Sequence, residues 1–284
     1  MKRLNAYTLK RSIGHAFLHL YFIMLTMSVV LPLFFTFYNS LKTNKEYYTS
    51  PMALPTQLHW ENYVSAWNKS DIGQYFFNTL FVTVTVIVIS AIIAAACAFA
   101  CTRLKVKLGS SVRMLFMAGL CIPSLLIIIP LFLVARQSGL VDSLWGLIII
   151  YICQRLPFSI FVLCGFYMTV PHELEEAATI DGAGVLQTWW LVDIPLVRPG
   201  ITTICVFAFT GVWNEYVIAA TLLYKPEIRT LVMAVRGIMD GAQYQADWAV
   251  MYAALIIILI PCLIIFACFR KYIMTGTTAG AVKG

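Results

Sequence analysis

Six long apolar segments constrain this chain more than any other feature of its sequence. Each is long enough to cross a bilayer as a helix, which takes roughly 20 residues. The expected spans are residues 16–38, 74–102, 112–134, 144–168, 200–223 and 250–270. The sequence therefore predicts an all-α, polytopic membrane protein whose residues 1–284 form a single transmembrane domain.

The composition of the chain favours a surface that is largely covered by lipid. Hydrophobic residues make up 61% and charged residues 12%, whereas soluble domains have roughly 25% charged residues. The net charge is +7, but the basic residues lie in short runs beside the apolar segments, which indicates membrane topology rather than nucleic-acid binding. All eight cysteines fall in apolar segments, so we expect reduced thiols, with no disulfide and no bound metal.

The distribution of Lys and Arg predicts the orientation in the membrane. With the N-terminus inside, the inner segments hold twelve basic residues and the outer segments hold seven. The positive-inside rule then places both termini in the cytoplasm. The outer segments become about 39–73, 135–143 and 224–249, and the longest cytoplasmic connection becomes residues 169–199.

The 169–199 connection has the pattern of a compact helical hairpin outside the membrane. Pro171 suits the first turn of a helix, and Gly182 suits a stop or a sharp turn. A second short helix is expected from about Val185 to Val192, and the two prolines that follow are expected to end the segment. On these features alone, a solvated amphipathic hairpin between two spans is the favoured interpretation.

The spacing of residues in this connection resembles the EAA loop of ABC-importer permeases. In that family, Glu-Ala-Ala is followed by three residues, Gly, nine residues and Ile-x-Leu-Pro. Here Glu176-Ala177-Ala178 precedes Gly182 and Val192-Asp193-Ile194-Pro195 at the same spacing, and Val192 and Ile194 are conservative departures. The resemblance implies coupling to a separate ATPase through Glu175, Glu176, Ala177, Ala178, Asp181, Gly182, Ala183 and Pro195.

Further motifs extend the resemblance over nearly the whole chain, to sugar-importer permeases of the maltose-permease type. They are Asn39-Ser40-Leu41-Lys42, Glu61-Asn62-Tyr63, Phe77-Asn78-Thr79-Leu80, Leu156-Pro157-Phe158, Ile180-Asp181-Gly182-Ala183, Trp213-Asn214-Glu215-Tyr216 and Gly280-Ala281-Val282-Lys283-Gly284. Within that group, the chain is similar to the shorter, six-span subunit of a heterodimeric pair.

The resemblance implies a non-catalytic permease subunit in the cell membrane, forming half of the translocation pathway of an ATP-driven sugar or oligosaccharide importer. Expected partners are a second permease subunit, two ATPase subunits that bind ATP and Mg, an extracytoplasmic sugar-binding protein and membrane lipid. This chain has no GxxxxGK[ST] phosphate loop, so we expect no cofactor in it.

Two other classes of membrane protein are alternatives. An ion-gradient-driven secondary transporter usually shows internal repeats and several intramembrane acids, whereas Glu215 is the only acidic residue within an expected span. An intramembrane enzyme is disfavoured because no expected span holds a nucleophile–base pair or a set of metal ligands.

Polar and aromatic residues within the spans are candidates for the translocation path. They are Asn78, Gln154, Arg155, Trp213, Asn214, Glu215 and Tyr216. Arg155, near the middle of the fourth span, needs a cavity or a partner, and suits sugar hydroxyls and a structural ion pair equally. The aromatic neighbours of Glu215 suit a sugar ring, although an interfacial aromatic belt with a buried helix contact is favoured. Because their depths differ by roughly 8 Å, we predict that Arg155 and Glu215 approach one another in at least one state.

Overall fold

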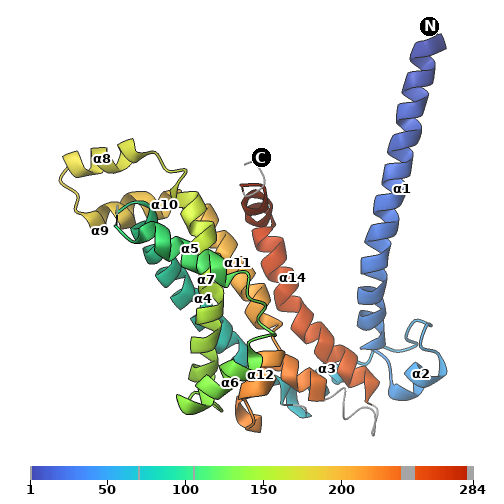
Figure 1. Ribbon diagram of the computed structural model, residues 1–284. Coiled ribbons are helices and arrows are strands. Elements are labelled where there is room, and N and C mark those ends of the chain that lie inside the picture. The colour runs from blue at the N-terminus through green and yellow to red at the C-terminus, as the bar shows by residue number, and fades with distance from the viewer. Residues whose placement is uncertain (1, 70, 105, 238–246, 280–284) are drawn as a thin grey trace. The chain divides into compact units, whose positions relative to one another are not determined.

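The computed structural model describes residues 2–69, 71–104, 106–237 and 247–279, and every regular element in those ranges is helical (Figure 1). The terminal Gly280–Gly284 motif lies outside the described residues. The chain divides into two compact units. Residues 1–70 and 238–257 form the first unit, and residues 71–237 and 258–284 form the second.

Four described helices are long and apolar enough to cross a membrane. They are the His15–Asn39 part of α1 (Lys2–Asn39), α4 (Ile72–Thr102), α7 (Leu144–Tyr167) and the Trp248–Phe269 part of α14 (Trp248–Ala279). They lie over the first, second, fourth and sixth expected spans. A fifth is present if the bent pair Val185–Leu196 and Arg198–Trp213 counts as one span. The count of six therefore stays a prediction.

The third apolar segment is not one continuous helix, as the sequence had suggested for residues 112–134. Instead, α5 (Gly109–Gly119) and α6 (Ile128–Gln137) are joined by turns. Pro123 lies in the gap, where its ring and missing N–H oppose a helix. Turn hydrogen bonds such as Leu126 N to Pro123 O, at 3.0 Å, pair part of the backbone there.

The fifth apolar segment is interrupted as well. The helix α11 (Arg198–Trp213) ends before Glu215, and α12 (Val217–Leu222) follows, so the expected helix over 200–223 is wrong in its middle. The Glu215 carboxylate accepts hydrogen bonds from the N–H groups of Ile218, at 2.8 Å, and Ala219, at 3.0 Å. These N–H groups begin α12, so the acidic side chain replaces the carbonyl partners that a continuous helix would supply.

The first unit closes one end of α1 with the short helices α2 (Asn44–Thr49) and α3 (Glu61–Lys69). Lys42 is fully buried there, and its Nζ donates to the carbonyls of Ser50, at 2.9 Å, and Pro51, at 3.0 Å. Its charge is therefore solvated by backbone dipoles. In α2, Tyr47 stacks on Trp248 of α14 with ring centroids 5.7 Å apart, so this unit is tied together by aromatic contacts.

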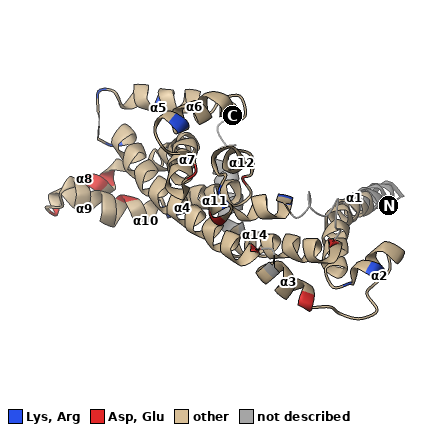
Figure 2. Ribbon diagram, turned by 90° about the horizontal axis from the view of Figure 1, so that it is seen from below, with Lys and Arg blue, Asp and Glu red and all other residues tan. Residues whose placement is uncertain are grey.

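The second unit is built on α4, α7 and α11, which pack against one another (Figure 1). Ala94 and Ala98 of α4 are completely buried, and small side chains of this kind allow helices to approach closely. Leu163 of α7 and Ile204 of α11 fill the same core, and Leu147 of α7 lies in a second core cluster. Charged residues are sparse along these helices, whereas acidic residues mark the α8 end of this unit (Figure 2). Apolar helices with charge gathered at one end suit a unit that crosses a membrane.

Candidate functional site

The 169–199 hairpin begins with α8 (His172–Ile180), and a tight turn follows in which Gly182 has a left-handed backbone conformation. Pro171 is the N-cap of α8, and Gly182 has a φ of +86° just after its end. The N–H of Ala183 donates to Ala178 O, at 2.9 Å, and that of Gly182 to Thr179 O, at 3.0 Å. These two bonds form a Schellman motif, for which a left-handed glycine is the usual residue. The expected sharp turn at Gly182 is present.

The return arm of the hairpin differs from the single helix expected over 185–192. It runs as α9 (Val185–Thr188), a π-helical turn (Trp189–Asp193) and α10 (Ile194–Leu196), and then bends by 73° into α11. Pro195 and Pro199 do not end the helical path. Each lies in the first turn of a helix, α10 and α11 respectively, where its missing N–H costs little. The arm therefore leads directly into α11.

Large apolar side chains are exposed on this otherwise polar hairpin. Ile180 is 86% exposed and Leu186 is 76% exposed, on the two sides of the turn. Leu174, Val185, Trp190 and Leu191 are exposed as well. Exposed apolar groups of this size are typical of a surface that contacts another protein or a membrane.

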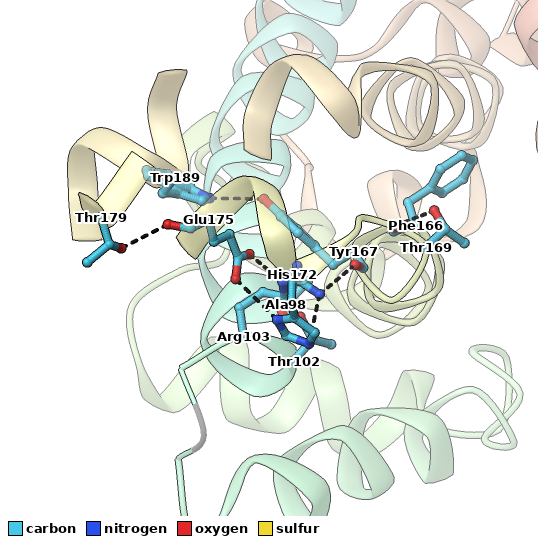
Figure 3. A network of polar contacts seen from close by, with 10 residues as sticks. All are labelled: Ala98, Thr102, Arg103, Phe166, Tyr167, Thr169, His172, Glu175, Thr179 and Trp189. Carbon is cyan, nitrogen blue, oxygen red and sulfur yellow. Dashed lines mark hydrogen bonds and ion pairs between the residues drawn. The ribbon is translucent and has the colours of Figure 1, made fainter. Parts of the chain in front are cut away.

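A network of polar contacts ties α8 to the ends of α4 and α7 (Figure 3). Arg103, directly after α4, is buried, and its Nε donates to Glu175 Oε1. Its Nη1 lies 3.4 Å from the carbonyl oxygen of Tyr167 and 3.4 Å from His172 Nε2. On the return arm, Trp189 Nε1 donates to Tyr167 Oη at 2.9 Å. Both arms of the hairpin are thus attached to the helices beneath them.

Asp193 is the least expected residue of this site. It ends the π-helical turn with 0% exposure, and neither of its carboxylate oxygens accepts a hydrogen bond from an N–H or O–H donor of the described residues. Burial, followed by the neighbouring Glu175, raises the pKa of Asp193 to about 7, and Arg103 opposes this rise. Neither Arg103 nor Asp193 is among the candidate site residues that the sequence pattern indicates. Their signal was charge at the membrane end of a span and in an otherwise apolar motif.

The eight expected coupling residues divide between the surface and the interior. Glu176, Ala177, Asp181 and Gly182 are exposed, and Ala178, Ala183 and Pro195 are half-buried. Glu175 differs from its neighbour Glu176 because its carboxylate is turned inward to Arg103, leaving 19% of its side chain exposed. Glu176 is therefore available to a partner protein, whereas Glu175 belongs to the internal network.

A second polar cluster joins α7 to the break after α11. Tyr151, which is 1% exposed, donates its hydroxyl to Glu215 Oε2 at 2.5 Å. Together with the two N–H groups of α12, this contact gives the Glu215 carboxylate three donors. Glu215 is half-buried, and these contacts fit its interpretation as a helix contact, while its role in the translocation path stays a prediction.

Arg155 follows Tyr151 by one helical turn and faces α11. A Cβ added to Gly211 would lie 2.3 Å from Arg155 Nη1, so the guanidinium occupies the space that this glycine leaves. Its Nε is buried without a partner, and no carboxylate oxygen of the described residues lies within 4.0 Å of its nitrogens. Glu215 is near enough for electrostatic attraction. The pair does not form a direct ion pair here, and its approach in another state stays a prediction.

The other path candidates make local structural contacts. Trp213 is buried, stacks on Phe209 with ring centroids 5.3 Å apart, and donates its Nε1 to Ile258 O at 3.2 Å. Asn78 Nδ2 donates to the carbonyls of Glu227, at 2.9 Å, and Arg229, at 3.0 Å, so it anchors the segment after α12.

Three further candidates complete the set. Asn214 and Tyr216 are exposed beside the break after α11, and Asn214 Nδ2 donates to Thr210 O at 3.0 Å. Gln154 has a buried Nε2 that finds no partner among the described residues. The structure therefore brings Arg155 and Glu215 into one neighbourhood, and it gives Trp213 and Asn78 structural contacts elsewhere.

Metal and thiol chemistry have little support in the described part of the chain. No group of three or more His, Cys, Asp or Glu residues there is arranged to hold a metal ion. All eight cysteines are present as free thiols, of which Cys164 is buried and Cys121, Cys153 and Cys268 are exposed.

Long apolar helices, a broken helix with buried polar contacts and a helical hairpin with exposed apolar side chains are features of a polytopic membrane protein. Residues 87–277 match the family of binding-protein-dependent transport system inner membrane components. The chain belongs to this family, and it is therefore a multi-pass inner membrane component of such a transport system.

Similar proteins match nearly the full length of the chain. The diacetylchitobiose uptake system permease protein NgcG of Streptomyces coelicolor is 30% identical over 96% of this chain and 89% of the relative. The inner membrane ABC transporter permease protein YcjP of Escherichia coli is 31% identical over 89% of this chain and 91% of the relative. A crystal structure of a bacterial ABC transporter for alginate import has a chain that matches with a TM-score of 0.81 and 24% identity, covering 92% of this chain and 96% of that chain. The last match shows that the fold is shared.

Proposed function

We propose that this chain forms half of the translocation pathway of an ATP-driven importer for a sugar or an oligosaccharide. It pairs with a second, different permease subunit, two ATPase subunits and an extracytoplasmic sugar-binding protein. Membership of the binding-protein-dependent family supports the importer class. The carbohydrate assignment is supported by relatives named for diacetylchitobiose and for melibiose, raffinose and stachyose.

The observation that carries the proposal is the geometry of the 169–199 hairpin. Its turn exposes Gly182 and large apolar side chains, while Arg103 holds its base inside the protein. A surface that is exposed at the tip and anchored at the root can transmit force from a docked partner to the helices. We therefore assign ATPase docking to the hairpin, with Glu176 as its exposed acidic group. ATP and Mg bind to the ATPase subunits and not to this chain.

The same proposal fixes the orientation and the transport path. Both termini and the hairpin lie in the cytoplasm, in accord with the excess of inner Lys and Arg, and the broken third and fifth apolar segments complete a set of six spans. Arg155 and Gln154 supply hydrogen-bond donors that meet sugar hydroxyls during passage, because each has a nitrogen that no group of the described residues satisfies. Glu215, by contrast, orders the break between α11 and α12.

Substitution of Gly182 by Arg tests the docking assignment. A Cβ at this position meets no atom of the described residues within 4 Å apart from its chain neighbours, so a long charged side chain has open space at the corner of the hairpin. We expect Gly182→Arg to abolish import and co-purification of the ATPase while the permease still inserts in the membrane. The matched control is Gly139→Arg, because Gly139 also has a positive φ, +66°, and open space around it, but lies between α6 and α7.

Two outcomes would contradict the proposal. If the Gly182→Arg complex still assembles and hydrolyses ATP in step with import, the hairpin is not the dock. If import by the native complex is abolished by an ionophore and persists without ATP, the chain serves a secondary transporter instead. Retained import with Gly139→Arg shows that backbone strain alone does not explain a loss at Gly182.

A further inference from the structure

The base of the hairpin contains one cation and two carboxylates in a buried space. Arg103 and Glu175 form an ion pair whose side chains are 4% and 19% exposed. Asp193 adds a second carboxyl group that is fully buried, on the π-helical turn that packs against α8, and it is near enough to Glu175 for the two charges to interact. No Lys, Arg or His nitrogen of the described residues lies within 4.0 Å of Asp193. If both acids were ionised, the cluster would carry an uncompensated negative charge.

The elements around Asp193 bring four titratable groups to the base of the hairpin. From α8 come Glu175, which is anionic, and His172, whose nitrogens face Arg103 and Glu175. From the end of α4 comes Arg103, already engaged with Glu175. From α7 comes Tyr167, which accepts a hydrogen bond from Trp189. A proton on one carboxyl group is the remaining means of balancing the charge.

We propose that Asp193 is a positioning residue that carries a proton and donates it in a hydrogen bond to Glu175. The bond joins the π-helical turn to α8, and Glu175 in turn joins both to Arg103 at the end of α4. The two arms of the hairpin and α4 then move as one body. This inference rests on the proposed docking function, because a rigid hairpin matters only if a partner drives it.

The position of Asp193 explains how the clamp, which is the cluster of Arg103, Glu175 and Asp193, is connected to the helix α11. Its carbonyl accepts the N–H of Val197 at 2.9 Å, directly before the 73° bend into α11. A π-helical turn is an uncommon element that is often found at functional sites. Loss of the Asp193–Glu175 bond would therefore separate α8 from the arm that leads into α11, and force applied at the tip would reach α11 less completely.

The direction of the pH dependence follows from the charge balance. Burial and Glu175 raise the pKa of Asp193 to about 7, so the proton is held on the acid side of neutrality and is lost as the pH rises. After its loss, the two carboxylates repel one another and the clamp opens. A single group with a pKa near 7 is roughly 90% protonated at pH 6 and roughly 10% protonated at pH 8.

The test is a pH profile of the assembled transporter in lipid bilayers. The measured quantity is the sugar imported per ATP hydrolysed, between about pH 6 and about pH 8. For the native protein we expect this ratio to fall several-fold as the pH rises through 7. Asp193→Asn keeps the shape and offers an amide donor to Glu175 at every pH, so we expect its ratio to stay at the acid value throughout.

Control variants separate Asp193 from other titrating groups. Glu173→Gln removes an exposed carboxylate from α8, the helix that carries Glu175. His172→Gln removes the imidazole that faces Glu175 on α8. We expect both to keep the native pH profile. A profile in Asp193→Asn that matches the native one, or a His172→Gln profile that becomes flat, would overturn the proposal.

Infrared spectroscopy of the assembled transporter supplies a second readout that does not depend on import. The carbonyl band of a protonated carboxyl group, present below pH 7 and lost above it, should be missing in Asp193→Asn and present in Glu173→Gln. An unchanged band in Asp193→Asn would refute the proton assignment. If the band behaves as expected while Gly182→Arg leaves docking intact, the docking function fails and the protonated Asp193 stands.

Discussion

The backbone of the hairpin turn can be perturbed without changing any side-chain contact. Gly182 has a φ of +86°, and a Cβ added there meets nothing within 4 Å. Gly182→Ala therefore has no steric clash with other residues, and its whole cost is that of placing a non-glycine residue in the left-handed region, roughly 1–2 kcal/mol. A change of that size raises the population of the open turn by about 5- to 30-fold.

Hydrogen exchange of the assembled transporter measures this change. The amides to follow are those of Gly182 and Ala183, which bond to Thr179 and Ala178 in the Schellman motif. Their exchange should accelerate by the same factor as the open population. Gly184→Ser is the matched control, because Gly184 also has open space but a φ of −75°, and Ser is a good N-cap for α9.

Equal exchange in Gly182→Ala and Gly184→Ser would refute this reasoning. It would mean that the turn relaxes to a conformation that alanine accepts, so that the left-handed geometry is not required. A faster exchange in both variants would also count against it, because Gly184 is not in a strained conformation. Faster exchange in Gly182→Ala, without faster exchange in Gly184→Ser, is the result that agrees with a backbone requirement at position 182.

Three further predictions concern the rest of the second unit and the thiols. Arg155→Met and Glu215→Gln should be non-additive for transport, with a coupling of about 0.5–3 kcal/mol, because the two charges attract one another; additive effects would show independent roles. Mass measurement of the denatured, alkylated protein without reductant should find eight modified thiols, and a disulfide would contradict the interpretation of the cysteines as small apolar residues. Asp142 Oδ1 accepts hydrogen bonds from the N–H groups of Lys225 and Tyr224, each at 2.9 Å, and these bonds lower the pKa of Asp142. The stabilisation that Asp142 provides should be present above the ordinary Asp pKa and should be lost as the pH falls through its lowered pKa. Asp142→Asn should therefore unfold at a lower temperature at neutral pH and show less acid sensitivity in a thermal melt, and an unchanged melting curve would exclude this role.

The apolar segments determined the membrane class and the main helices from the sequence alone. An apolar run of some 20 residues has few alternatives to a spanning helix, because lipid cannot satisfy backbone groups. The helices α4 and α7 consequently begin and end within a few residues of the expected limits. The hairpin turn was equally local, because the special φ at Gly182 is a property of one residue type.

The breaks in the third and fifth apolar segments were decided by more than apolarity. Pro123 was visible in the sequence, but a proline within a span can produce either a kink or a break. At Glu215, the outcome depended on Tyr151 and the α12 amides, which meet the carboxylate only after α7 and α11 have packed together.

The charge network at the base of the hairpin was decided entirely by the tertiary structure. The network joins residues that are far apart in the sequence. Arg103 and Glu175 are separated by 72 positions, and Glu175 and Asp193 lie on opposite arms of the hairpin. The sequence pattern predicts an exposed acidic helix here, and on such a helix Glu175 and Glu176 would have the same surroundings. Packing of α8 over the end of α4 turns one of them inward to Arg103 and leaves the other outside. Their different roles arise because burial and charge pairing depend on distance in space, which the sequence does not state.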